Sequence, residues 1–262
     1  MDIFEQLLEA KRKHLAVSLC MVIATNGSTP RHAGSKMLVY EDGHIAGTVG
    51  GGEVENRVIQ EGLAAIKDGK TRRLSYSMTD PARGDVGVCG GQVEVYVEPV
   101  LPQPLLLVIG GGHVGKALAH LGHWLGFRVA VSDDRVELCT PEENPDADEF
   151  YPVDMAELPK HLKSDARTYV VLTTRGMVVD VPGLPALLDM PAAYIGVIGS
   201  RRRWTMTRKS LLEAGIPAEK LERVVAPIGL ELHAETPEEI AVSIMAEIMM
   251  LRNGGTGQRM KV

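Results

Sequence analysis

The segment Leu105-Leu-Leu-Val-Ile-Gly-Gly-Gly-His-Val-Gly115 indicates how the second half of this chain folds. Its first five residues are apolar, which predicts a short buried strand, and the residues after it have helical spacing. Between strand and helix, Gly110, Gly112 and Gly115 match the G-x-G-x-x-G pattern. Glycines in this pattern allow a tight turn, close approach of a phosphate to the backbone and close helix packing. The segment therefore predicts a nucleotide-binding strand–turn–helix unit.

The rest of the second half alternates in the same way between apolar strands and helices. Strands are expected at residues 127–132, 168–173 and 193–198, and helices at residues 181–189, 201–214 and 238–252. Strands that alternate with helices imply a parallel sheet with right-handed crossovers. We therefore expect an α/β protein whose residues 104–262 form a Rossmann-like domain with a parallel sheet.

Asp133 ends the strand that follows the glycine turn, where a carboxylate can accept hydrogen bonds from ribose hydroxyls. The alternative is a turn that only packs a helix on a sheet. His113, inside the turn, is not typical of dehydrogenases, and no evident acid–base set follows it. The motif thus favours a nucleotide-like ligand, NAD(P) or another nucleotide, without establishing hydride transfer.

The first half has a different pattern, and Pro99-Val-Leu-Pro-Gln-Pro104 is the expected linker between the halves. This pattern mixes helices with strands that do not alternate regularly, so residues 1–100 are expected to form an α+β domain. Helices are expected at residues 1–14 and 53–67, and strands at residues 15–24, 36–40, 44–49, 72–78 and 92–98.

A second glycine turn, Gly50, Gly51 and Gly52, opens the helix expected at residues 53–67. Backbone N–H groups at a helix N-terminus suit an anion, although the glutamates in the first turn of this helix compete with one. Upstream, Arg31 is placed to grip an oxyanion through a bidentate pair. The alternative for Arg31 is a solvated side chain on a turn.

Two further segments are candidate sites. Cys89 lies in a glycine-rich loop, where an unshielded thiol near N–H donors can become a nucleophile or sulfur carrier. Inert burial is the default for a cysteine. Ser200 and Arg201 follow a strand and open a helix, so they can bind a phosphate or the acidic patch of a partner at the carboxyl edge of the sheet. The alternative there is a solvated basic helix start.

Composition narrows the functional classes. The 262 residues carry a net charge of −6, which argues against general affinity for nucleic acid or anionic membranes. No run reaches the roughly 18 apolar residues of a membrane span. The three cysteines are widely spaced and fit a reducing cytoplasm rather than a disulfide framework. No CxxC or HxxxH pair indicates zinc, and no metal ligands are predicted.

Taken in order, segments across nearly the whole chain resemble the XdhC/CoxI family, the accessory factors for xanthine dehydrogenase and related molybdenum hydroxylases. The ordered set is more specific than any one of its members. The matching stretches are Gly27-Ser-Thr-Pro-Arg31 with Gly34, Thr48-Val-Gly-Gly-Gly-Glu-Val-Glu55, Cys89-Gly-Gly91, Gly110-Gly-Gly-His-Val-Gly115, Asp133-Asp-Arg135, Tyr194-Ile-Gly-Val-Ile-Gly-Ser-Arg-Arg-Arg203, and Ala226-Pro-Ile-Gly-Leu230 leading into Glu235-Thr-Pro-Glu-Glu-Ile-Ala241.

The resemblance implies a cofactor chaperone that is non-catalytic or weakly catalytic. Such a protein binds molybdenum cofactor (molybdopterin) as cargo, assists its sulfuration and delivers it to an apo molybdenum hydroxylase, with a cysteine desulfurase as a further partner. Cys89 is then the expected sulfur relay, and a homodimer is expected. Met177 departs from the histidine common in the family, so a function that depends on that histidine would be lost or altered here. An NAD(P)-dependent oxidoreductase and a nucleotide-sensing regulatory module stay open as alternatives.

Overall fold

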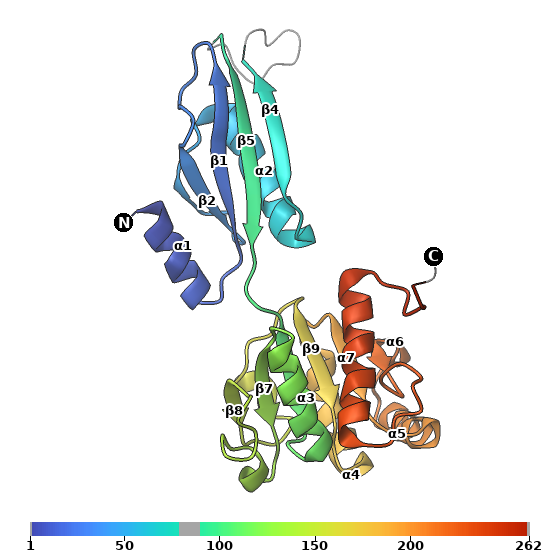
Figure 1. The fold of residues 1–262 in the computed structure, drawn as a ribbon. Coiled ribbons are helices and arrows are strands. Elements are labelled where there is room, and N and C mark those ends of the chain that lie inside the picture. The colour runs from blue at the N-terminus through green and yellow to red at the C-terminus, as the bar shows by residue number, and fades with distance from the viewer. Residues whose placement is uncertain (1, 79–89, 261–262) are drawn as a thin grey trace. The chain divides into compact units, whose positions relative to one another are not determined.

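The computed structural model describes residues 2–78 and 90–260. The chain divides into two compact units, Met1–Pro102 and Gln103–Val262, each with its own sheet and core (Figure 1). The boundary falls within the proline-rich segment 99–104. Cys89 lies outside the described residues. Within the described ranges, no helix combines the length and apolar character that crossing a membrane requires.

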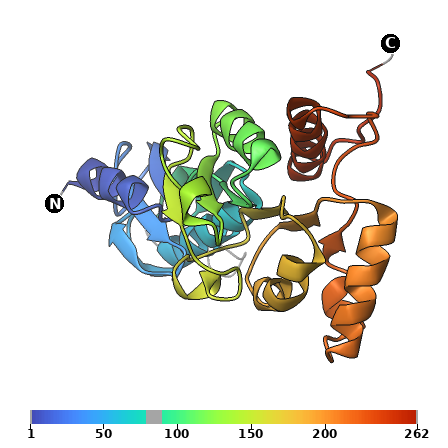
Figure 2. The same cartoon turned by 90° about the horizontal axis from the view of Figure 1, so that it is seen from below.

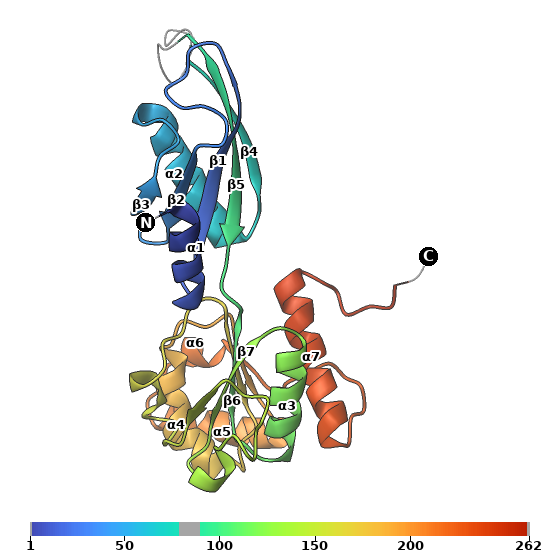
Figure 3. The same cartoon turned by 60° about the vertical axis from the view of Figure 1, so that its left-hand side comes forward.

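The first unit is an antiparallel sheet in the order β3-β2-β1-β5-β4 with helices packed against it. Helix α2 runs along one face, behind the sheet in Figure 1 and in side view in Figure 3. Its elements are α1 (Ile3–Arg12), β1 (Val17–Asn26), β2 (Lys36–Tyr40), β3 (Ile45–Gly47), α2 (Gly52–Asp68), β4 (Arg72–Ser77) and β5 (Gln92–Val100).

Alternation along the strands explains how this sheet serves two small cores. Val93, Val95 and Val97 are buried at every second position of β5 and pack toward α2. On the other face, Val17 and Leu38 pack with residues of α1. Successive side chains of a strand point to opposite faces, so one central strand pair can support a helix on each side.

The second unit is a six-stranded sheet in the order β11-β10-β9-β6-β7-β8, with every pairing parallel. Counted along this unit, the order is 3-2-1-4-5-6, that of the doubly wound dinucleotide-binding fold. Its elements are β6 (Leu105–Ile109), α3 (His113–Trp124), β7 (Arg128–Ser132), β8 (Glu149–Tyr151), β9 (Thr168–Leu172), α4 (Met177–Leu188), β10 (Tyr194–Val197), α5 (Arg201–Glu213), α6 (Ala218–Leu221), β11 (Val224–Val225) and α7 (Pro237–Asn253), with short 3-10 turns at Val136–Leu138 and Leu158–Lys160.

Helices cover both faces of the six-stranded sheet. Figure 2 shows α3 and α7 on one side and α4 and α5 on the other. Leu106 and Val108 of β6 pack with α3 and α7, whereas Leu105, Leu107 and Ile109 pack with α4 and α5. This two-sided burial accounts for the uninterrupted apolar run of β6. The expected fold class, an α+β domain followed by a Rossmann-like domain with a parallel sheet, is confirmed.

Some elements differ from their predicted bounds. Helix α4 begins at Met177, four residues before the predicted start, and contains Pro182 and Pro185. Prolines disfavour a helix interior, but the buried side chains of Leu184 and Leu187 hold α4 against the sheet. The prediction omitted β8, α6 and β11, because segments of two to four residues carry no periodicity.

The core of the second unit can be tested in the middle of β6. We expect Leu107→Ala to lower the free energy of unfolding of this unit by about 2–5 kcal/mol, because Leu107 is fully buried and truncation leaves a cavity. Urea unfolding followed by tryptophan fluorescence measures this unit alone, since Trp124 and Trp204 both belong to it. Leu251→Ala, at an exposed position, is the control and should change stability by less than about 0.5 kcal/mol. Equal effects of the two variants would contradict the packing described.

Candidate functional site

The carboxyl edge of the second sheet carries most of the predicted site residues. The chain leaves β6 toward β7 and later returns to β9 on the other side, so β6 and β9 form the point where the strand order reverses. Ligands of open α/β sheets bind at such a point. A Cβ at Gly115 would lie 1.8 Å from the carbonyl oxygen of Gly110, whereas a Cβ at Gly112 would meet nothing within 4 Å. Gly115 therefore serves packing, and Gly112 leaves the N-terminus of α3 approachable.

Asp133 holds the glycine turn from the inside. Its side chain is buried, and Oδ2 accepts hydrogen bonds from Gly111 N (2.8 Å) and Arg135 Nη2 (2.9 Å). Oδ1 accepts from Arg135 N (2.9 Å) and Arg135 Nε (3.0 Å). The carboxylate predicted to bind ribose therefore already has four donors from the protein. His113, by contrast, is exposed as the first residue of α3.

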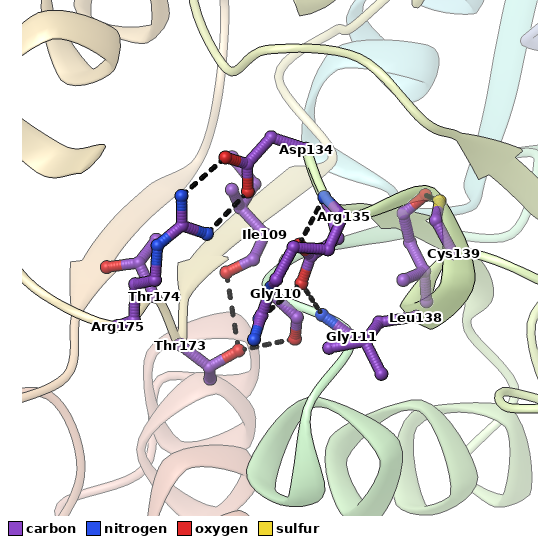
Figure 4. Close-up of polar contacts among 12 residues, drawn as sticks. Ile109, Gly110, Gly111, Asp134, Arg135, Leu138, Cys139, Thr173, Thr174 and Arg175 are labelled. Carbon is purple, nitrogen blue, oxygen red and sulfur yellow. Dashed lines mark hydrogen bonds and ion pairs between the residues drawn. The ribbon is translucent and has the colours of Figure 1, made fainter.

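A second carboxylate, that of Asp134, forms an ion pair across the same edge of the sheet. Asp134, after β7, accepts two hydrogen bonds from the Arg175 guanidinium, after β9, at 2.6 and 2.5 Å (Figure 4). Because β6 lies between β7 and β9, the Asp134–Arg175 pair spans the end of β6 beside Gly110. The guanidinium lowers the pKa of Asp134 to about 2, so the carboxylate stays charged across the neutral range.

The residues at the basic N-terminus of α5 have two different roles. Ser200 caps the helix by accepting from Arg203 N at 3.2 Å. Arg203 reaches back to the buried Asp180 at 2.6 Å and to Thr174 at 3.0 Å. Gly199 permits this path, since a Cβ there would lie 2.8 Å from Cδ of Arg203. Arg203 is therefore a structural residue, whereas Arg201 stays exposed.

Arg201 borders a cavity of about 460 Å³ formed by two segments that are distant in the sequence. The first segment is Ile198 to Arg201, after β10, and the second runs from Pro227 to Ala234, after β11. These segments include parts of two stretches that carry the family resemblance, Tyr194–Arg203 and Ala226–Leu230, and the structure brings them together. A cavity of this size lies within the range of about 300–1,000 Å³ typical of small-molecule sites.

Two α7 residues that the sequence analysis missed hold one wall of this cavity. Ser243 Oγ donates to Leu230 O at 2.6 Å, and the Glu247 carboxylate accepts from Gly229 N at 2.9 Å and from the Tyr194 hydroxyl. In the sequence, Glu247 stands between apolar residues in the second half of the segment predicted as a helix. This pattern could have identified it as a candidate.

In the first unit, two predicted site segments and the described residue Gly90 lie close together at one end of the sheet. A Cβ at Gly27 would lie 2.9 Å from Gly90 O, and a Cβ at Gly50 would lie 3.4 Å from the side chain of Pro30. Gly90 directly follows Cys89, and Arg31 directly follows Pro30. The turn at Gly50, Gly51 and Gly52, the loop with Arg31 and the residues after Cys89 are therefore neighbours.

The glycine turn at Gly50, Gly51 and Gly52 is also occupied from within. The Glu55 carboxylate accepts from Val49 N at 3.1 Å, from Gly51 N at 3.2 Å and from the Thr48 hydroxyl. An anionic ligand at this turn would have to displace Glu55 or bind beside it. Glu55 is therefore the glutamate that would compete with an anionic ligand at the start of α2.

The Arg203–Asp180 ion pair provides a stability test. We expect Arg203→Met to lower the free energy of unfolding by about 3–5 kcal/mol, because it leaves the fully buried Asp180 carboxylate uncompensated. The double variant Arg203→Met with Asp180→Asn should lose clearly less than the single variant, since no buried charge is left behind. Urea unfolding followed by circular dichroism measures both. An Arg203→Met protein as stable as the wild type would show that the pair is dispensable.

Comparisons with known proteins cover both units. Residues 106–248 match the XdhC Rossmann domain, and residues 10–77 match the XdhC and CoxI family. The chain is 34% identical over 259 residues to the uncharacterized protein YqeB of Escherichia coli K12, covering 98% of this chain and 47% of YqeB. It is 24% identical over 274 residues to the molybdenum cofactor insertion chaperone PaoD of the same organism, covering 94% of this chain and 86% of PaoD.

A third relative is a probable xanthine dehydrogenase component of Bacillus subtilis, 33% identical over 162 residues, or 60% of this chain and 46% of the relative. The chain thus spans about half the length of YqeB and of this component. A crystal structure described as a xanthine dehydrogenase from Bacillus halodurans matches with a TM-score of 0.52 at 22% identity, over 98% of this chain and 97% of that chain, and supports the fold. Because the Rossmann-domain match alone covers more than half of its residues, the chain belongs to the XdhC and CoxI family.

Proposed function

We propose that this chain binds molybdenum cofactor and inserts it into a xanthine dehydrogenase-type molybdenum hydroxylase. The observation that carries the proposal is the cavity of about 460 Å³ between the segments after β10 and β11. The name of PaoD, a molybdenum cofactor insertion chaperone, supports the cargo, and the name of the Bacillus subtilis relative supports the class of recipient.

The chemistry of the cavity suits this cargo. Molybdopterin combines a flat pterin with a terminal phosphate. Arg201 supplies a guanidinium at the cavity edge, beside the N-terminus of α5, and both favour a phosphate. Ile198, Ile228 and Leu230 offer apolar walls for the ring system. Ser243 and Glu247 keep the second wall in place through their bonds to Leu230 and Gly229.

Sulfuration of the bound cofactor is the second part of the proposal, with Cys89 as the residue that receives sulfur from a cysteine desulfurase. Burial raises the pKa of the Cys20 thiol to about 12, and Cys139 is buried with its thiol donating to Val131 O. Neither thiol suits a reactive role, because the thiolate is the nucleophile. We further propose a cytoplasmic homodimer as the working form.

The cargo proposal can be tested with two adjacent arginines. Protein purified anaerobically from a molybdenum-replete host should carry molybdenum and pterin in near-stoichiometric amounts. Arg201→Ala should reduce the bound pterin roughly tenfold, because a charge-assisted bond to the phosphate is lost. Arg202→Ala is the matched control, since Arg202 is exposed on the same helical turn but does not border the cavity. Bound adenine nucleotide with no pterin would instead favour a nucleotide-sensing module or an NAD(P)-dependent oxidoreductase.

The sulfur proposal requires a separate measurement. Cys89→Ala should leave the amount of bound pterin unchanged but abolish the cyanolysable sulfur delivered to the recipient hydroxylase, and with it the activation of that enzyme. Cys139→Ala, which removes a buried thiol, is the control and should retain delivery. Unchanged sulfuration by the Cys89→Ala protein would assign the sulfur relay elsewhere.

A further inference from the structure

The two edges of the first sheet are protected unequally. At one edge, β3 has only three residues, and a Cβ at Gly47 would lie 2.9 Å from Cδ1 of Ile3, so α1 lies against this strand. At the other edge, β4 has six residues and pairs with β5 on one side (Figure 1). Within the described residues, no strand pairs with its other side. Short strands and covering helices keep an edge from pairing with other chains, so β3 is protected, whereas β4 is open.

The bond pattern at the end of β4 shows which backbone groups face outward. Met78 N donates to Gly91 O at 2.9 Å, so the backbone groups of Met78 point toward β5. These groups alternate in direction from residue to residue along an antiparallel strand, and the register between β4 and β5 is regular. Leu74 therefore bonds to β5, whereas the N–H and C=O groups of Arg73 and Ser75 point away from β5.

A groove of about 590 Å³ lies between β4 and α2. Arg73, Leu74, Ser75 and Tyr76 all border it, although neighbouring side chains of a strand point to opposite faces. The groove therefore reaches over the outer edge of β4, where the backbone lies. Leu74 and Tyr76, together with Ile59 of α2, are half-buried and make part of its wall apolar. An extended segment in this groove would find both backbone partners and apolar contacts.

The charged side chains at this groove all have partners of opposite charge within the same chain. The pairs are Glu53 with Arg57 (2.9 Å), Glu61 with Arg72 (2.8 Å) and Arg73 with Glu94 (2.6 Å), and the neutral polar residues of the lining are Asn56, Gln60 and Ser75. A strongly acidic or basic segment would meet no uncompensated charge here, so the groove favours an occupant whose charges are balanced in the same way. The β4 strand of a second copy meets this requirement, because its two arginines carry their own carboxylate partners.

We infer that β4 pairs antiparallel with β4 of a second copy across a two-fold axis, which joins their two five-stranded sheets into one continuous sheet. Such a pair satisfies outward backbone groups of both copies at once. The inference rests on the homodimer proposed above and names the surface through which it forms. The contact belongs to the first unit, whereas the cavity proposed for molybdopterin belongs to the second, so the two proposals can fail independently.

The outward groups also indicate the register. A pairing centred on Leu74 sets Arg73 opposite Ser75 of the second copy, so their outward N–H and C=O groups bond reciprocally. The two Leu74 side chains then meet at the axis and remove apolar surface from water. A pairing centred on Arg73 would instead set two arginines directly opposite each other, which is unfavourable.

The first test is sedimentation equilibrium of the full chain. The wild type should be a dimer, and Ser75→Pro should weaken the dimer at least about tenfold, because proline removes an outward donor from each copy. A proline whose missing N–H lies on the outer side of an edge strand is compatible with the sheet, and circular dichroism checks the fold. Ser75→Ala keeps the donor and is the matched control, so it should dimerise as the wild type does.

Cross-linking tests the register directly. In a Cys89→Ala background, Leu74→Cys should form a disulfide-linked dimer under mild oxidation. Facing residues at this axis have Cα atoms about 4.5 Å apart, which is within the range that a disulfide spans. Ser75→Cys is the matched control and should stay unlinked, because the two substituted residues lie two positions out of register with each other. Cys20 and Cys139 are buried and do not interfere.

The opposite results would overturn the inference. A Ser75→Pro dimer as tight as the wild type would move the interface elsewhere and leave the proposed homodimer standing. Linkage through Ser75→Cys but not through Leu74→Cys would contradict the register. A monomeric wild type would remove the homodimer and this inference together, while the pterin bound per chain still tests the cargo proposal. If that monomer bound its recipient hydroxylase and the Ser75→Pro variant did not, β4 would be assigned to the recipient instead.

Discussion

The burial of β6 on both faces is the constraint on which the second unit depends. Leu106 and Val108 require helices on one side, and Leu105, Leu107 and Ile109 require helices on the other. Parallel strands joined by crossover helices supply both covers. Once β6 is central, its carboxyl end becomes the place where the strand order reverses. The glycine turn, the Asp134–Arg175 pair and the pocket of about 20 Å³ that borders Gly110 all lie at that end for this reason.

Both glycine turns are stabilised by an internal carboxylate. Glu55 accepts from the turn at Gly51, and Asp133 accepts from the turn at Gly111. Each arrangement satisfies backbone N–H groups of the turn that leads into a helix. The two turns therefore do not stand empty for a ligand. A ligand must use the N–H groups that remain or displace the carboxylate, which makes the pockets beside the turns the more accessible sites.

The arginines after Gly199 illustrate how one motif divides its roles. Arg203 is committed to the buried Asp180, and it holds the start of α5 against the end of β9 through Thr174. That anchoring leaves Arg201 at the edge of the large cavity. A basic helix start opposes the helix dipole, and the buried Asp180 supplies the compensating negative charge for Arg203. Arg203 thus positions Arg201, the arginine that we propose binds a phosphate.

The sequence by itself determined the two-unit organisation, the parallel sheet and the places of both glycine turns, because apolar runs and glycine patterns are local signals. It placed the start of α4 at residue 181, next to Pro182, whereas the helix begins at Met177 and burial maintains it through both prolines. Only the tertiary structure decided what each polar residue does. Asp133 was predicted to face a ribose, yet its carboxylate is taken by donors from the protein. Asp134 meets Arg175 only because β7 and β9 flank β6. Such partners are tens of residues apart, and their bonds depend on distances of a few ångströms that no local pattern encodes.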